Sequence, residues 1–237
     1  MPLPKINTPT YELILPSTGK KIKYRPFLVR EEKILIMALE GENNQEITNS
    51  IIQILSDCIL TKNINVSKLA TFDIEYLFLN VRAKSVGETV EVNVTCPDDN
   101  KTSVQMEIAI DSIKVQKTKG HKNIIKLDDQ YSMKLKYPSM DEFVDNNFES
   151  DNENNVNKSL SMITNCIEMI YDEEESWSAA DSTKQELEEF IDQLNSKQFK
   201  SVEKFFETMP KLSHKIKVKN PATGVESEVV LEGLASF

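Results

Sequence analysis

The sequence predicts an α+β fold, with hairpins and helices in the N-terminal part and a helical C-terminal half closed by a final β-hairpin. Three observations support this class. Residues 72–110 change from helical spacing of apolar side chains to strict alternation. Residues 11–24 and 216–231 alternate on both sides of a turn that contains proline, and residues 156–209 repeat apolar side chains at helical spacing.

The first element is a predicted hairpin over residues 11–24. Tyr11 and Leu13 occupy alternate positions of its first strand, and Pro16-Ser17-Thr18-Gly19 has the composition of a turn. Such an edge can pair with a neighbouring subunit as readily as with its own sheet. We therefore take Tyr11 and Leu13 as candidate protein contacts.

Three helices are predicted before residue 90: helix-favouring residues indicate one over residues 29–39, and helical spacing indicates one from residue 47 to about residue 61 and one over residues 72–86. We expect the third helix to end at Gly87 in a left-handed conformation. Val90, Val92 and Val94 then alternate with polar residues and predict a hairpin that turns at residues 96–100.

The middle of the chain contains the predicted domain boundary. Residues 112–120 are polar and lysine-rich and are expected to form a loop with some extended character; a hairpin over residues 125–137 and a short helix from the capping box Ser139-Met140-Asp141-Glu142 follow. Residues 149–155 contain no apolar side chain. The predicted division is an N-terminal α+β region (1–148), a flexible connection (149–155) and a helical region with a C-terminal hairpin (156–237).

The C-terminal region is predicted to begin with one helix over residues 156–170. The acidic residues 172–175 would end it with negative charge at the unfavourable end of the helix dipole, a pattern more typical of a solvated loop than of a partner site. Thr183 and Glu186 have capping-box spacing and predict the next helix.

Two more candidate contacts lie in the last helix, and two lie in the tail. Phe205 and Phe206 belong to a phenylalanine-rich segment, so part of that helix face is a candidate interface. We expect alanine at both positions to weaken association with partners more than folding. Leu234 and Phe237 are apolar residues of the last five, which predicts a docked terminus.

Composition limits the classes of function. The 237 residues include 28 Lys and Arg against 38 Asp and Glu, which gives a formal net charge of −10. This balance argues against nucleic acid as a principal ligand. The sequence predicts no membrane span and no signal-peptide core, so we expect synthesis in a reducing cytoplasm.

Cysteine usage indicates neither disulfides nor zinc. Cys58, Cys96 and Cys166 are an odd number without short spacing, and Cys58 and Cys166 fall on apolar helical faces. The turns at residues 96–100 and 220–224 resemble paired zinc-ribbon knuckles, yet only one cysteine is present. We therefore expect a metal-free ribbon and no cofactor.

Catalytic motifs are also missing from the sequence. A nucleophile–base pair would need His121 or His214, and neither lies in a recognisable motif. With 6 glycines, the chain has no phosphate-cradling loop. We expect a protein that is not an enzyme; a hydrolytic or metal-dependent enzyme is the weakest of three hypotheses.

Several short sequence segments resemble those of a known protein family. They are Leu77–Glu88, Val94–Pro97, Lys136–Pro138, Ile170–Glu175, Phe190–Leu194, Lys217–Pro221 and Leu231–Leu234. Together they resemble the baseplate hub subunit family of T4-like contractile-tailed bacteriophages, over most of the chain from about Tyr11 to Phe237.

The resemblance implies a structural subunit of the central hub region of the tail baseplate, made in the host cytoplasm and placed in the virion. Its partners would be other baseplate and hub proteins, and copies of itself in a symmetric assembly are also compatible. The alternative is a hub assembly factor that is absent from the mature virion, for which polar, transient contacts would be typical.

Overall fold

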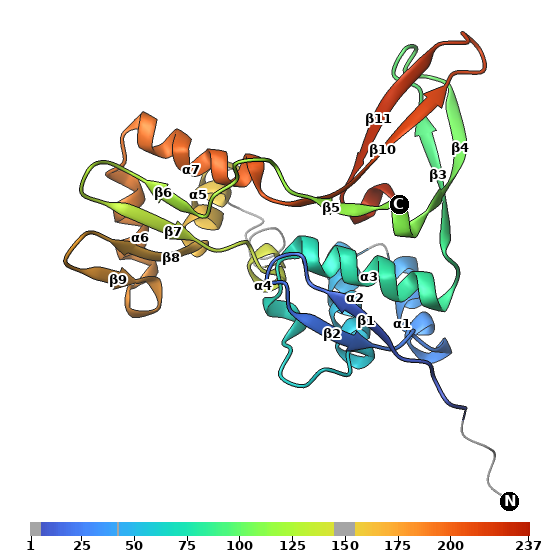
Figure 1. The fold of residues 1–237 in the computed structure, drawn as a ribbon, viewed down its shortest axis with the longest axis horizontal. Coiled ribbons are helices and arrows are strands. Elements are labelled where there is room, and N and C mark those ends of the chain that lie inside the picture. Colours follow the sequence, from blue (N-terminus) through green and yellow to red (C-terminus); the bar gives the residue numbers. More distant parts are fainter. Residues whose placement is uncertain (1–5, 42, 145–154) are drawn as a thin grey trace, which may run out of the picture. The chain divides into compact units, whose positions relative to one another are not determined.

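The computed structural model describes residues 6–41, 43–144 and 155–237, and these residues form the predicted α+β fold (Figure 1). Contacts between Cα atoms divide the chain into two compact units. Unit 1 contains Met1–Val66, Phe72–Gln116 and Lys211–Phe237, and unit 2 contains Ser67–Thr71 and Lys117–Pro210.

This division differs from the one expected around residues 149–155. The C-terminal hairpin belongs to unit 1 because its first strand, β10 (Lys211–Lys219), pairs with β5 (Lys114–Gln116). Residues 112–120 are therefore not all loop. Of the expected flexible connection only Asn155 is described, and it is the first residue of a helix.

Unit 1 combines three small antiparallel sheets with three helices. Its strands pair in the orders β1-β2, β3-β4 and β11-β10-β5. The bounds not yet given are β1 (Tyr11–Ile14), β2 (Lys21–Tyr24), α1 (Val29–Glu40), α2 (Asn44–Cys58), α3 (Thr71–Ser85), β3 (Thr89–Thr95), β4 (Ser103–Ala109) and β11 (Glu226–Glu232).

The expected glycine cap of α3 is wrong. The left-handed glycines of the described chain are Gly19, Gly120, Gly224 and Gly233, so Gly87 is not among them. The helix ends at Ser85, whose hydroxyl donates to the Val81 carbonyl at 2.6 Å and accepts from the Phe27 amide at 2.9 Å.

One core cluster of unit 1 lies between the β3-β4 hairpin, the β10-β11 hairpin and α3. Buried valines of β3 pack with Ile108 of β4 and with Ile110, and Leu212, Ile216 and Val218 of β10 complete the cluster. In β3 and β10 the alternation of buried and exposed residues follows the sequence pattern, as predicted for strands with one covered face.

Unit 2 is a four-stranded antiparallel sheet with helices packed on it (Figure 1). The strand order is β6-β7-β8-β9. The bounds are β6 (Ile124–Lys126), β7 (Ser132–Leu135), α4 (Met140–Val144), α5 (Asn155–Asn165), β8 (Ile167–Tyr171), β9 (Ser176–Ser178), α6 (Lys184–Asp192) and α7 (Ser196–Thr208).

The predicted helix over 156–170 is wrong beyond Asn165. Residues 167–171 form strand β8, and the pairing of β8 with β7 contains an irregularity between Lys134 and Leu135. This bulge places Glu168 out of phase, so the buried residues Ile167 and Ile170 are three positions apart and imitate helical spacing. The acidic residues 172–175 therefore form a hairpin turn, where the Asp172 carboxylate accepts from the amides of residues 174 and 175.

The capping signals of unit 2 are confirmed. Ser139 and Glu142 form the predicted capping box of α4, and Thr183 and Glu186 form that of α6. Asn195 caps α7 in the same way and separates it from α6. The core of this unit is built from Met133 and Leu135 of the sheet and from apolar residues of the three longer helices, among them Phe205.

Candidate protein-contact surfaces

Helix α1 has an inverted distribution of side chains. Its buried residues are Glu31 and Ala38, whereas large apolar side chains face away from the protein. Met37 is 70% exposed and Val29 is 65% exposed. We call the exposed apolar residues Leu28, Val29, Ile36, Met37 and Leu39 the α1 face.

Glu31 holds the buried side of α1 in place. Its carboxylate accepts from Arg25 at 2.9 Å, from Arg30 at 2.6 Å and from the Leu28 amide at 2.7 Å. Burial alone would raise the pKa of this carboxyl, but the three hydrogen bonds outweigh burial and lower the pKa to about 2. The ion-paired Glu31 carboxylate therefore occupies a buried position that an apolar side chain usually fills, and the apolar side chains of α1 lie on its solvent-exposed side.

The tips of the two long hairpins are joined by a polar cluster. Asn220 donates from its side-chain amide to both carboxylate oxygens of Asp98 at 3.0 Å, and the Thr223 hydroxyl also donates to Asp98. We call Asp98, Asn220 and Thr223 the clasp. It lies where paired zinc-ribbon knuckles would hold a metal, and hydrogen bonds to a carboxylate make the connection here.

The same turn recurs in all three hairpins of unit 1. In each turn the carbonyl of the residue before proline accepts from the amide four positions later, and that later residue has positive φ. The three turns are Leu15–Gly19, Cys96–Asn100 and Asn220–Gly224. The first is fixed to α3, because the Ser17 amide donates to buried Asp73 at 3.0 Å.

The cysteines are poor ligands and nucleophiles. All three are buried and free. Burial raises the pKa of Cys58 to about 11 and that of Cys166 to about 12, so both remain protonated near neutral pH. Among the described residues no three His, Cys, Asp or Glu side chains gather to hold a metal ion.

Neither histidine forms an activated nucleophile–base pair. His214 Nε2 lies 3.5 Å from the Ser112 hydroxyl, which donates to the Ala109 carbonyl at 2.6 Å. His121 lies between the hydroxyls of Thr208 (3.0 Å) and Tyr137 (3.1 Å). Because Thr208 donates to a carbonyl, His121 donates from Nδ1 and accepts at Nε2, and burial lowers its pKa, which favours this neutral form.

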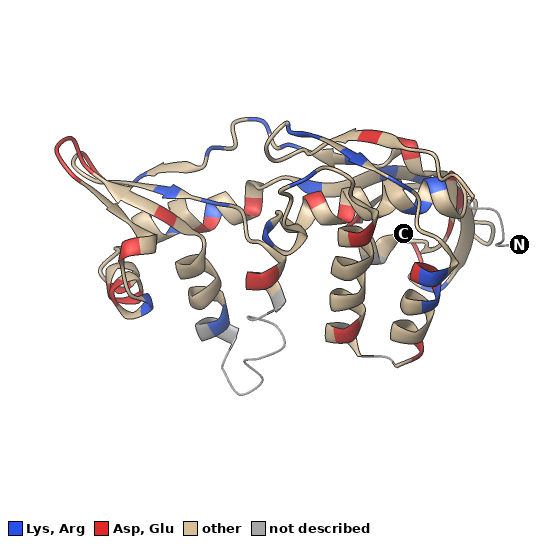
Figure 2. Cartoon of the chain, turned by 90° about the horizontal axis from the view of Figure 1, so that it is seen from below, with Lys and Arg blue, Asp and Glu red and all other residues tan. Residues whose placement is uncertain are grey.

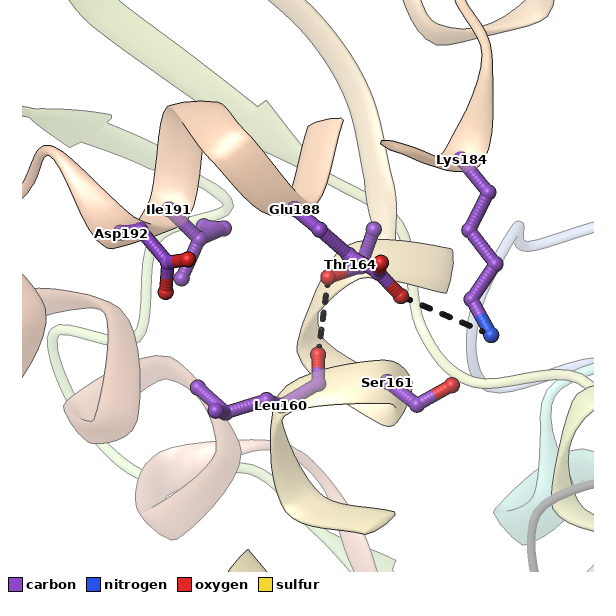
Figure 3. Close-up of a pocket in the computed structure, with 7 residues that line it drawn as sticks. All are labelled: Leu160, Ser161, Thr164, Lys184, Glu188, Ile191 and Asp192. Carbon is purple, nitrogen blue, oxygen red and sulfur yellow. Dashed lines mark hydrogen bonds and ion pairs between the residues drawn. The ribbon is translucent and has the colours of Figure 1, made fainter. Parts of the chain in front are cut away.

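A polar hollow of about 270 Å³ lies between α5 and α6 (Figure 3). Lys184 and Glu188 form an ion pair at 3.6 Å on consecutive turns of α6, and the Thr164 hydroxyl donates to the Leu160 carbonyl at 2.9 Å. Ser161 and Asp192 also line this hollow.

The family comparison decides the identity. The family model described as "T4 bacteriophage base plate protein" matches residues 8–237, which is nearly the whole chain. The chain belongs to this family. Comparisons with curated proteins and with solved structures gave no match.

The first-hairpin candidates of this base plate protein are mostly covered. Leu13 is buried, and the Tyr11 ring packs against Tyr24 with centroids 5.8 Å apart. Lys84 Nζ lies 5.5 Å from the Tyr11 ring centroid. Tyr11 is partly exposed, so of the two residues it is the one that can still contact a partner.

The two phenylalanines of α7 have different positions. Phe205 is 1% exposed and packs with His121, Tyr137 and Phe206. Phe206 is partly exposed and lines an apolar hollow between α5 and α7. Alanine at Phe206 is therefore still expected to weaken association with partners more than folding. Phe205 occupies a core position, so alanine there would remove a side chain that the fold needs.

The C-terminal candidates dock within unit 1. The Leu234 amide donates to Glu75 of α3 at 3.2 Å, and Leu234 and Phe237 pack against the core between the hairpins. Burial raises the pKa of Glu75. Both side chains are partly exposed, so they remain candidate contacts as well as anchors of the terminus.

The sequence did not single out Trp177. It lies on β9, is 41% exposed, and its ring centroid is 6.2 Å from that of Tyr131. Trp177 and Tyr131 line a hollow of about 430 Å³ together with Leu187 and Phe190. Trp177 is the only tryptophan of the sequence, and this could have marked it as a candidate contact. The α1 face had no such signal, because its residues fit an ordinary amphipathic helix equally well.

Across the described chain no helix combines the length and the apolar character that crossing a membrane requires. Lysines and arginines are interspersed with acidic residues on helices and strands (Figure 2).

Proposed function

We propose that this base plate protein is a structural subunit of the central hub region of the phage tail, and that it acts through protein–protein contacts during tail assembly. Its partners are other baseplate and hub proteins, it forms in the host cytoplasm, and it remains in the virion. No catalysed reaction is part of this function.

The α1 face carries the proposal. Large apolar side chains exposed to water are unfavourable by about 25 cal/mol per Å², and groups of them in native proteins commonly mark interaction sites. The buried Glu31 fixes α1 in this orientation, so the apolar side is not simply misplaced core. Membership of the base plate family supplies the assembly in which the face would be covered.

Substitution on this face tests the proposal. Ile36→Ser with Met37→Ser removes apolar surface that touches little of the chain itself, so folding should be retained while incorporation into baseplates falls. Val86→Ser is the matched control, because Val86 is also exposed in unit 1 (62%) but lies outside the α1 face. Incorporation would be measured by quantifying the protein in particles assembled in infected cells that carry each variant.

Equal incorporation of the double variant and the control would contradict the proposal. A loss of incorporation accompanied by a matching loss of thermal stability would also count against it, because α1 would then be ordinary core.

A hub assembly factor absent from the mature virion is the competing function. The polar hollow between α5 and α6 and the acidic turn at residues 172–175 suit the smaller, more polar contacts of transient complexes.

A further inference from the structure

The structure of unit 2 contains a basic surface within this acidic protein. Two neighbouring depressions, of about 430 and 520 Å³, share Ser201 and Lys204 of α7. Five exposed lysines line these depressions, and we call them the lysine surface: Lys119, Lys122, Lys197, Lys200 and Lys204.

The positive charges of these lysines are not neutralised by ion pairs within the described part of the chain. All five are exposed, and none forms an ion pair with another described residue. Lys126, which lines the same depression, pairs with Asp129 at 2.8 Å and is therefore left out of the set. No acidic residue lines either depression, and the glutamates of α7, Glu203 and Glu207, line a different hollow beside Phe206.

The position of the lysines on α7 is unfavourable for the helix itself. The first turn of α7 contains no acidic residue and does contain Lys197, although helix N-termini favour negative charge. The helices α1, α2, α3, α4 and α6 carry acidic residues there, whereas α5, like α7, does not. Lys197, Lys200 and Lys204 extend over about 10 Å of helix at 1.5 Å per residue, which suits an extended chain better than a small ion.

We propose that the lysine surface binds an acidic polypeptide segment of a neighbouring baseplate protein. This inference rests on the proposed function and specifies the chemistry of one partner. An acidic segment would neutralise the lysines and bring negative charge to the α7 N-terminus, and the Ser196 hydroxyl would donate a hydrogen bond to one of its carboxylates. Nucleic acid is less suited, because no arginine lines these depressions and the aromatic side chain that does, Phe205, is buried and cannot stack on a base.

The test uses the full chain and a fluorescent twelve-residue glutamate peptide, with binding followed by anisotropy. The variant K197A/K200A/K204A should bind roughly tenfold or more weakly than the wild type, the sum of three modest charge contacts. The control K215A/K217A/K219A removes the same charge from exposed positions of β10 and should bind about as well as the wild type. Circular dichroism would verify that both variants fold, as expected for exposed lysines replaced by the best helix former in α7.

Equal losses in the two variants, or absence of measurable binding by the wild type, would overturn the inference. Tighter binding of a twelve-nucleotide thymidine oligomer through the same lysines would overturn it in favour of nucleic acid. If the peptide result fails while the α1-face variants still block incorporation, only this inference fails and the proposed function stands.

Discussion

At the scale of single residues, Glu31 decides how α1 lies. The sequence indicates an amphipathic helix over residues 29–39, and the structure confirms the helix. Periodicity gives no indication that a glutamate faces inward, because the burial depends on Arg25, which lies outside the helix and accounts for one of its ion pairs. Local pattern predicts the element, and tertiary pairing determines its orientation.

Replacing Glu31 should be strongly destabilising. Glu31→Ala leaves Arg25 partly buried without its partner, and breaking a buried pair in this way costs about 3–5 kcal/mol. Glu32→Ala, on the exposed side of the same turn, should change the free energy of unfolding by less than about 0.5 kcal/mol. Urea denaturation measures both; similar small effects would contradict the role given to Glu31.

The same residue gives a pH dependence. Its folded pKa of about 2 lies below the ordinary value of 4.5, so the ion pair contributes stability above about pH 4.5 that is lost as pH falls towards 2. The Glu31→Ala variant should therefore lose less of its free energy of unfolding than the wild type between pH 5 and pH 2.

At the scale of elements, the sequence predicts most helices and hairpins, including the capping boxes of α4 and α6. Two failures have definite causes. A bulge makes β8 imitate a helix, and β5 is recognisable only through its pairing with a strand nearly a hundred residues later. Short strands whose partner is distant give little local signal.

The clasp between the hairpin tips should stabilise unit 1 without metal. Hydrogen bonds from Thr223 and Asn220 lower the pKa of Asp98, so Asp98→Ala should reduce the melting temperature by a few degrees at neutral pH. Asp111→Ala is the control, because Asp111 is an exposed carboxylate of unit 1 outside the clasp. Adding Zn²⁺ should leave the melting temperature of the wild type unchanged; a rise would indicate that the tips bind metal after all.

At the scale of the whole molecule, the proposed contact surfaces belong to different units. The α1 face lies in unit 1, and the lysine surface lies in unit 2. The predicted boundary around residues 149–155 rested on composition alone, which cannot show that β10 returns to the N-terminal elements. The two proposals therefore assign chemically different neighbours to the two units.

The six candidate contacts named from the sequence differ in exposure. Tyr11, Phe206, Leu234 and Phe237 retain partly exposed side chains, whereas Leu13 and Phe205 are buried. Sequence patterns identify large apolar residues, but they do not separate those that fill a core from those that meet a partner.

Quantitative mass spectrometry of purified phage particles tests most directly whether this protein is a structural baseplate subunit. We predict that the chain is present at a fixed copy ratio to the other baseplate proteins, and that this ratio survives a high-salt wash. Its absence from mature particles that assembled in its presence would contradict a structural role and would favour the assembly factor.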